Sequence, residues 1–185
     1  MAQYRTELLA LKIAPSHCDL LATWLFQEFV QLPSELKSAI RANEIVPIQE
    51  RLDELVAFQS FVDDIRLMDI SPGFVRAHVI TQNYICFVYL GEALFQKLRK
   101  PSPPSSTLRK CSEFLTDNPV RAFRNAIAHA NWQYKSDFTG LVYWSRKGDD
   151  KDAPLTQWEV SQQTLSFWQG LARTVGYVVY SALAE

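Results

Sequence analysis

Arg124 and His129 enclose the segment RNAIAH, and together they offer two side chains suited to phosphodiester chemistry. An imidazole titrates near pH 6.5 and moves protons at neutral pH. A guanidinium matches phosphate oxygens with a rigid fork of N–H donors. An RNA strand carries its own nucleophile, the ribose 2′-hydroxyl, so no metal ion or covalent residue is needed. These residue types therefore suit metal-independent RNA cleavage.

The spacing of the pair is weak support by itself. With 11 Arg and 3 His in 185 residues, chance supplies about half a match per chain when spacings of four to six are allowed. An ordinary solvated helix face with a surface histidine explains the same pattern. The elements that position the pair therefore decide between the two interpretations.

Asn118 and Pro119 predict the start of a helix that carries the pair, because Asn is favoured as N-cap and Pro as the first helical residue. At about 100° per residue, the polar side chains gather on one face and the apolar ones on the other. The polar face holds Arg121, Arg124, Asn125 and His129, and the apolar face holds Val120, Phe123, Ile127 and Ala130.

On this face Arg124 and His129 lie about 140° apart, so one helix cannot clamp one phosphate with both side chains. The geometry predicts a composite site or a bent phosphate path between helices.

The charge is unevenly distributed, although the net charge is only -1. Residues 97–135 carry eight bases and two acids, a net charge of +6, and residues 43–70 carry a net charge of -5. Any polyanion binding must therefore come from a local patch. A solvated surface with uneven charge explains this distribution equally well. The candidate RNA-binding residues are Lys97, Arg99, Lys100, Arg109, Lys110 and Arg121.

The composition, 48% hydrophobic and 21% charged, predicts one globular domain over residues 1–185. Helical periodicity dominates and predicts an all-α, up-and-down bundle. The loop at 101–106, PSPPSS, cannot be helical. Predicted helices occupy residues 20–30, 34–40, 52–67, 74–100, 107–115 (with Thr107 as cap) and the RNAIAH segment.

The pattern changes after Trp132, where residues 141–144 and 155–160 are rich in β-branched and aromatic types. They flank a polar turn region, KGDDKDAP, and predict a small β-hairpin before the last helix. Ser161 is expected to cap that helix.

Cys18, Cys86 and Cys111 are widely spaced and predict buried free thiols. No Cys/His cluster has ligand spacing, so neither a metal site nor a cofactor is expected. Charges near the N-terminus interrupt any signal-peptide core, and residues 77–91 are too short and polar to span a bilayer. We therefore expect a cytoplasmic protein without a membrane partner.

Other residues have ordinary explanations. His17 is expected at a helix start and His78 in the core, and Trp132 and Tyr134 fit a core or dimer contact better than base stacking. Sequence motifs of nucleotide-binding loops, zinc proteases and α/β-hydrolases are absent.

The segment Arg124-Asn125-Ala-Ile-Ala-His129 resembles the HEPN superfamily, whose mark is R-x(4–6)-H, often with Asn directly after the Arg. The resemblance implies a bundle of four or five helices with the motif on a late helix. This sequence departs from the family at Asn131, two positions after His129, where many members paired with nucleotidyltransferase antitoxins have Tyr.

The resemblance implies an endoribonuclease whose motif helices meet across a homodimer, in a toxin or defence effector restrained by an antitoxin or regulatory protein. In it His129 would be the general acid and base, Arg124 would stabilise the phosphorane, and Asn125 would orient the reacting groups. Some HEPN proteins retain the motif and serve mainly as dimerisation or interaction modules, and a non-catalytic module of this kind is the alternative.

Overall fold

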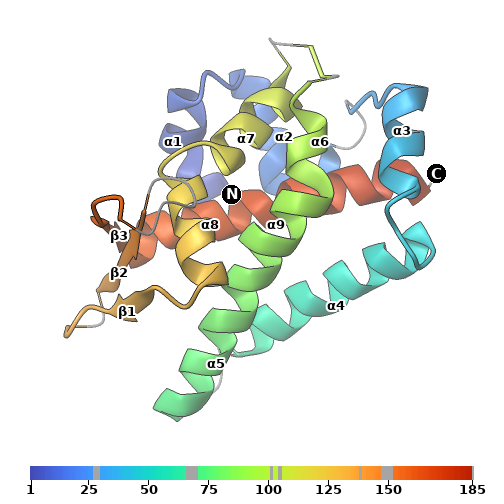
Figure 1. The fold of residues 1–185 in the computed structure, drawn as a ribbon. Helices are drawn as coiled ribbons and strands as arrows, with labels where there is room; N and C mark the ends of the chain where they lie inside the picture. The colour runs from blue at the N-terminus through green and yellow to red at the C-terminus, as the bar shows by residue number, and fades with distance from the viewer. Residues whose placement is uncertain are drawn as a thin grey trace.

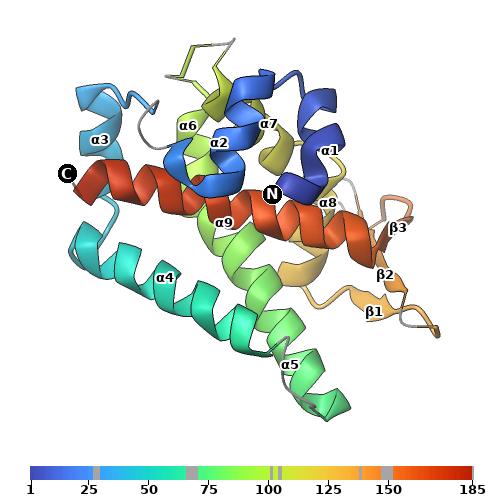
Figure 2. The ribbon, with the colours of Figure 1, turned by 180° about the vertical axis from the view of Figure 1, so that it is seen from behind.

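The last helix, α9 (Gln162–Ala184), forms the centre of the protein. Its side chains are buried on almost every side from Leu165 to Leu183, and they include polar ones such as Gln169 and Arg173. In the computed structural model, α9 lies between α4 (Ile48–Ile65) on one side and α1 (Arg5–Ala10) and α2 (Pro15–Thr23) on the other (Figures 1 and 2). The structure describes residues 1–26, 30–65, 71–100, 102–103, 106–137, 139–146 and 152–184.

A long helical segment crosses α9 and runs through α5 (Pro72–Asn83), two π-helical stretches (Tyr84–Tyr89 and Gly91–Phe95) and α6 (Gln96–Leu98) (Figure 1). The Ser71 hydroxyl caps it by accepting a hydrogen bond from the Phe74 amide at 3.4 Å. The helix predicted at residues 74–100 is therefore confirmed. The π-helical turns, which are rare and often lie at functional sites, were not predicted.

Helices α3 (Ser34–Arg41) and α4 confirm the helices predicted at residues 34–40 and 52–67. Leu67, the last residue of the second prediction, lies outside the described residues. The helix predicted at 20–30 is wrong in extent, because α2 starts earlier and ends at Thr23, where Trp24 turns left-handed at φ 61°. Residues 27–29 of that prediction lie outside the described residues. Helix α7 (Thr107–Thr116) is also present, but Ser106 caps it, since its hydroxyl accepts from the Arg109 amide at 3.2 Å. Helix α1 and the 3₁₀ turn Ala2–Tyr4 before it were not predicted.

The sheet has three antiparallel strands in the order β1 (Trp132–Tyr134), β2 (Gly140–Ser145) and β3 (Thr156–Ser161). Strands β2 and β3 are the predicted hairpin, and β1 extends it. Residues 147–151 of the turn region lie outside the described residues. Gly140 allows the close pairing of β2 with β3, because a Cβ there would lie 2.2 Å from the Val160 carbonyl oxygen.

Ser161 ends β3 and also caps α9, as predicted, because its hydroxyl accepts a hydrogen bond from the Thr164 amide at 3.1 Å. The fold is therefore mainly helical, with a small antiparallel sheet directly before its central helix.

Candidate functional site

Helix α8 (Val120–Ala128) carries the RNAIAH segment and begins one residue later than predicted. Asn118 is not the N-cap: Pro119 occupies that position, and no side chain caps the helix. Only a tight turn separates α7 from α8, and within it the Arg121 amide donates to the Asp117 carbonyl at 2.9 Å. The Asp117 carbonyl thus accepts a hydrogen bond from an amide in the first turn of α8, which a capping side chain would otherwise do.

Phe123 fixes the orientation of α8. It is fully buried, and its ring makes edge contacts with Phe87, Tyr143 and Trp168 at centroid distances of 5.4, 5.1 and 5.8 Å. These rings belong to the long helical segment, to β2 and to α9. One aromatic side chain therefore ties α8 to three other elements.

The predicted division of α8 into two faces holds for the helix itself. Val120 and Ile127 are buried beside Phe123, while Arg121 is exposed and Arg124 and Asn125 are half-buried. Ala130 is an exception, because it is exposed and lies beyond the end of the helix.

Arg124 is held by two oxygen acceptors. It forms an ion pair with Glu92 of the second π-helical stretch, and its Nη1 donates to Asn125 Oδ1 at 2.8 Å. Its side chain remains 28% exposed, and that of Glu92 is 61% exposed. The guanidinium is therefore oriented but accessible, and a phosphate could compete with Glu92 for it.

His129 lies at the C-terminal cap of α8, with an exposed side chain. The helix ends in a Schellman motif, in which the Asn131 amide donates to the Ala126 carbonyl at 2.8 Å and the Ala130 amide to the Ile127 carbonyl at 3.2 Å. Ala130 takes the left-handed conformation, φ 57°, that usually requires Gly. The backbone that carries His129 is therefore fixed while its imidazole faces solvent.

Arg76, on α5, lies close to the end of α8 and was not predicted as a site residue. Its guanidinium carbon is 5.9 Å from the centre of the Trp132 ring, which in turn contacts Tyr134 edge-on at 5.6 Å. Burial raises the pKa of Tyr134, and the positive charge of Arg76 partly opposes this shift. Arg76 lies outside the basic block in the sequence, so only the packing of α5 beside α8 reveals it.

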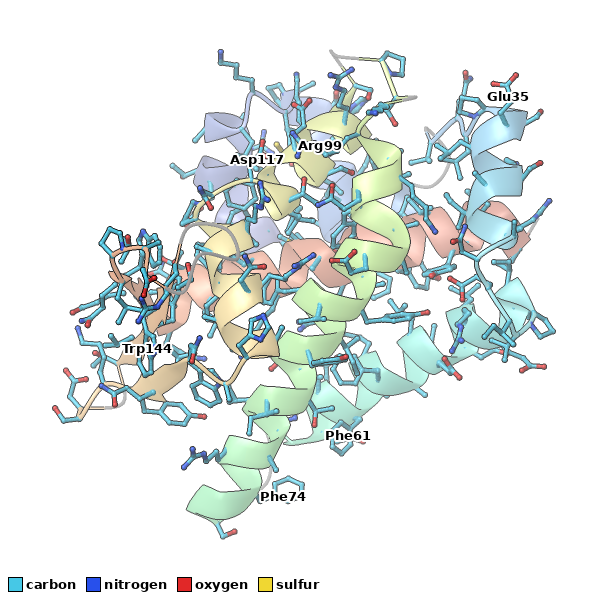
Figure 3. The ribbon with its side chains drawn as sticks, in the orientation of Figure 1. Glu35, Phe61, Phe74, Arg99, Asp117 and Trp144 are labelled. Carbon is cyan, nitrogen blue, oxygen red and sulfur yellow. The ribbon has the colours of Figure 1, made fainter. Side chains whose placement is uncertain are left out.

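The structure places the predicted RNA-binding cations on several elements, and Arg121 alone among them lies on α8. Arg99 lies near the turn before α8, in an ion pair with Asp117 at 2.8 Å (Figure 3), and Arg109 pairs with Glu113 at 2.8 Å. Lys97 faces elsewhere: burial lowers its pKa, and the charge of Glu44, between α3 and α4, partly offsets the shift.

Of the remaining predicted cations, Lys110 Nζ donates to the Lys12 carbonyl at 2.6 Å, and both Lys100 and Arg121 are exposed. Much of the positive charge counted in the sequence is therefore paired with acids or directed to other faces.

Cys18, Cys86 and Cys111 are buried free thiols, as predicted. Across the described ranges, no group of three or more His, Cys, Asp or Glu side chains is placed to hold a metal ion. Within the same ranges, no helix has both the length and the apolar character needed to cross a membrane. Comparisons with family models, curated proteins and solved structures gave no match to this chain.

Proposed function

We propose that this chain is a metal-independent endoribonuclease of the HEPN type, with a HEPN-like helical bundle and an active site completed across a homodimer. The observation that carries the proposal is the placement of Arg124, Asn125 and His129 on α8. Arg124 is oriented by Asn125 and Glu92, and the His129 imidazole is exposed at the helix end.

The chemistry assigned to the site is an internal transesterification. The ribose 2′-oxygen attacks phosphorus, the bond from phosphorus to the 5′-oxygen breaks, and a 2′,3′-cyclic phosphate remains. His129 accepts the 2′-hydroxyl proton and passes a proton to the leaving 5′-oxygen, so one histidine serves as general base and then as general acid. Arg124 stabilises the added negative charge on the phosphorane.

The positions of Arg124 and His129 favour a site made from two copies. They are five residues apart, which corresponds to about 7.5 Å along the helix axis and about 140° around it. A second α8 placed antiparallel to the first would bring Arg124 of one copy towards His129 of the other. A two-fold axis produces this arrangement directly.

The test is cleavage of a single-stranded RNA in EDTA by protein purified free of partners. We expect products that end in 2′,3′-cyclic phosphate, and a loss of at least 100-fold in rate for Arg124→Ala and His129→Ala. Arg5→Ala is the matched control, because Arg5 is also an ion-paired surface arginine but lies on α1. An uncut RNA, or full activity in both α8 variants, contradicts the proposal.

Mixing the two inactive variants tests the dimer. If Arg124 and His129 act from opposite copies, a mixed dimer of Arg124→Ala and His129→Ala protein contains one intact site. That site is formed by Arg124 of one copy and His129 of the other, so part of the activity returns. A site within one copy predicts no recovery.

One observation favours the alternative, a non-catalytic dimerisation or interaction module. Arg124 already has a carboxylate partner in Glu92, which a phosphate would have to displace. If the alternative holds, the chain dimerises in solution. Any RNA cleavage in EDTA and any RNA binding are then the same in the parent and in the His129→Ala variant.

A further inference from the structure

A surface cavity of about 350 Å³ lies on a different part of the protein from Arg124 and His129. Its walls come from the turn between α1 and α2, from α2 and the segment after it, and from the start of α7 with the residues before it. This volume falls within the range of small-molecule sites. The cavity is lined by Lys12, Ala14, His17, Phe26, Val30, Gln31, Ser102, Pro103, Ser106, Thr107, Leu108 and Lys110.

The cavity is positively charged. Lys12 and Lys110 both line it, and the 2.6 Å hydrogen bond from Lys110 Nζ to the Lys12 carbonyl brings the two residues together. Among the residues that the structure describes, those lining the cavity include no Asp or Glu. The first turn of α7 also contributes, because backbone N–H groups at a helix N-terminus favour an anion.

The remaining walls combine fixed polar groups with an apolar surface. His17 Nδ1 and Thr107 Oγ1 are 2.7 Å apart, and Thr107 is buried. The His17 ring also rests edge-on against buried Phe26, at 5.5 Å between centroids. Phe26, Val30 and Leu108 supply apolar surface beside the charged end.

Lys12 has an unfavourable backbone conformation. It lies at φ 59°, directly after α1, where the Lys12 and Ile13 amides donate to the Leu9 and Leu8 carbonyls. This left-handed position at a helix end favours Gly. Strain of this kind is often found at ligand-binding sites. Here a lysine occupies a position that favours Gly, and that lysine is one of the residues that line the cavity.

We propose that this cavity binds a small phosphorylated molecule with an apolar or aromatic body. The phosphate lies against Lys12, Lys110 and the start of α7, and the body lies against Phe26, Val30 and Leu108. The site is separate from the one on α8, because the cavity lies at the N-terminal end of α7 and α8 follows the opposite end. Lys110 therefore belongs to this site and not to the proposed RNA surface.

The test uses three probes, inorganic phosphate, ribose 5-phosphate and adenosine 5′-monophosphate, in thermal-shift and calorimetric titrations at constant ionic strength. We expect the nucleotide to raise the melting temperature most, and Lys110→Gln to weaken its binding at least tenfold. Lys12→Gly should weaken binding while leaving the unliganded protein at least as stable, since Gly suits the left-handed position. Lys100→Gln is the control, because Lys100 is an exposed lysine outside the cavity.

Three outcomes overturn the proposal. The first is the absence of any response to all three probes beyond that to sodium chloride. The second is an undiminished response in both Lys110→Gln and Lys12→Gly, and the third concerns His129. His129→Ala protein should respond like the parent, which separates this site from RNA cleavage. Loss of the response in that variant would place the phosphate on α8 and would also overturn the proposal.

Discussion

Arg124 and Glu92 form an ion pair that joins α8 to the second π-helical stretch of the long helical segment. The carboxylate lies where a phosphate would have to approach the guanidinium. It therefore orients Arg124 and also competes with a bound anion. Because the Glu92 side chain is 61% exposed, solvent screens the pair and its contribution to stability is small, at most about 1 kcal/mol.

Substitution Glu92→Gln should tighten RNA binding by about two- to tenfold, because it removes a negative charge beside the phosphate site. The measurement is fluorescence anisotropy with labelled RNA, in the His129→Ala background so that the RNA stays intact. Glu113→Gln is the control, because Glu113 pairs with Arg109 on α7. Equal affinities for the Glu92 and Glu113 variants would show that no phosphate binds at Arg124.

Arg76 should contribute to the same RNA surface, because it lies over Trp132 just beyond the end of α8. We expect Arg76→Ala to weaken RNA binding severalfold and to lower the slope of log affinity against log salt by about 1. Lys37→Ala, on α3, should leave the slope unchanged. An unaltered slope for Arg76→Ala would show that Arg76 does not contact the RNA.

The left-handed residue after α8 gives a prediction about stability. Ala130→Gly should raise the free energy of unfolding by about 0.5–1 kcal/mol, since the relief of αL strain exceeds the added chain entropy. Ala128→Gly, at the last residue of α8, should lower it by at most about 1 kcal/mol. Urea denaturation measures both changes. Destabilisation by both substitutions would mean that Ala130 carries no strain.

The buried thiols predict a loss of stability at alkaline pH. Burial raises the pKa of Cys86 to about 11 and that of Cys111 to about 12. Above about pH 8.5 an unfolded thiol loses its proton while a buried one keeps it, so the unfolded state gains stability as pH rises. Each thiol should remove about 1–2 kcal/mol between pH 8 and 10.

The check is urea denaturation at pH 8 and pH 10 for the parent and for Cys86→Ala. Between pH 8 and pH 10 the free energy of unfolding should fall less in Cys86→Ala than in the parent, by the contribution of one thiol. A fall of equal size in both proteins would exclude Cys86 as a source of the pH dependence.

Periodicity in the sequence was enough to predict the long elements. The apolar run of α9 and the stripe of the long helical segment persist over many turns, and Ser161 marks the start of α9 as predicted. Strand β1 was missed because three residues are too few to show alternation. Trp24 and Ala130 turn left-handed without being Gly or Asn, so their residue types did not mark the ends of their helices.

The side chains of the candidate site were predictable, but their partners were not. Helical geometry predicted that Arg124 and Asn125 share a face, and their hydrogen bond follows from it. The ion pairs of Arg124 with Glu92 and of Arg99 with Asp117 depend on how helices pack. The count of bases in residues 97–135 contains no such information, so it overstated the positive charge available near α8.

Asn131 links the end of α8 to the sheet through both of its backbone groups. Its amide donates to Ala126, and its carbonyl accepts from the Trp144 amide at 3.0 Å. Hydrogen exchange at the Asn131 and Trp144 amides should therefore report one shared opening event, in which the strand edge and the last turn of α8 separate together. The mobility of the His129 backbone is thus limited by how often the sheet opens.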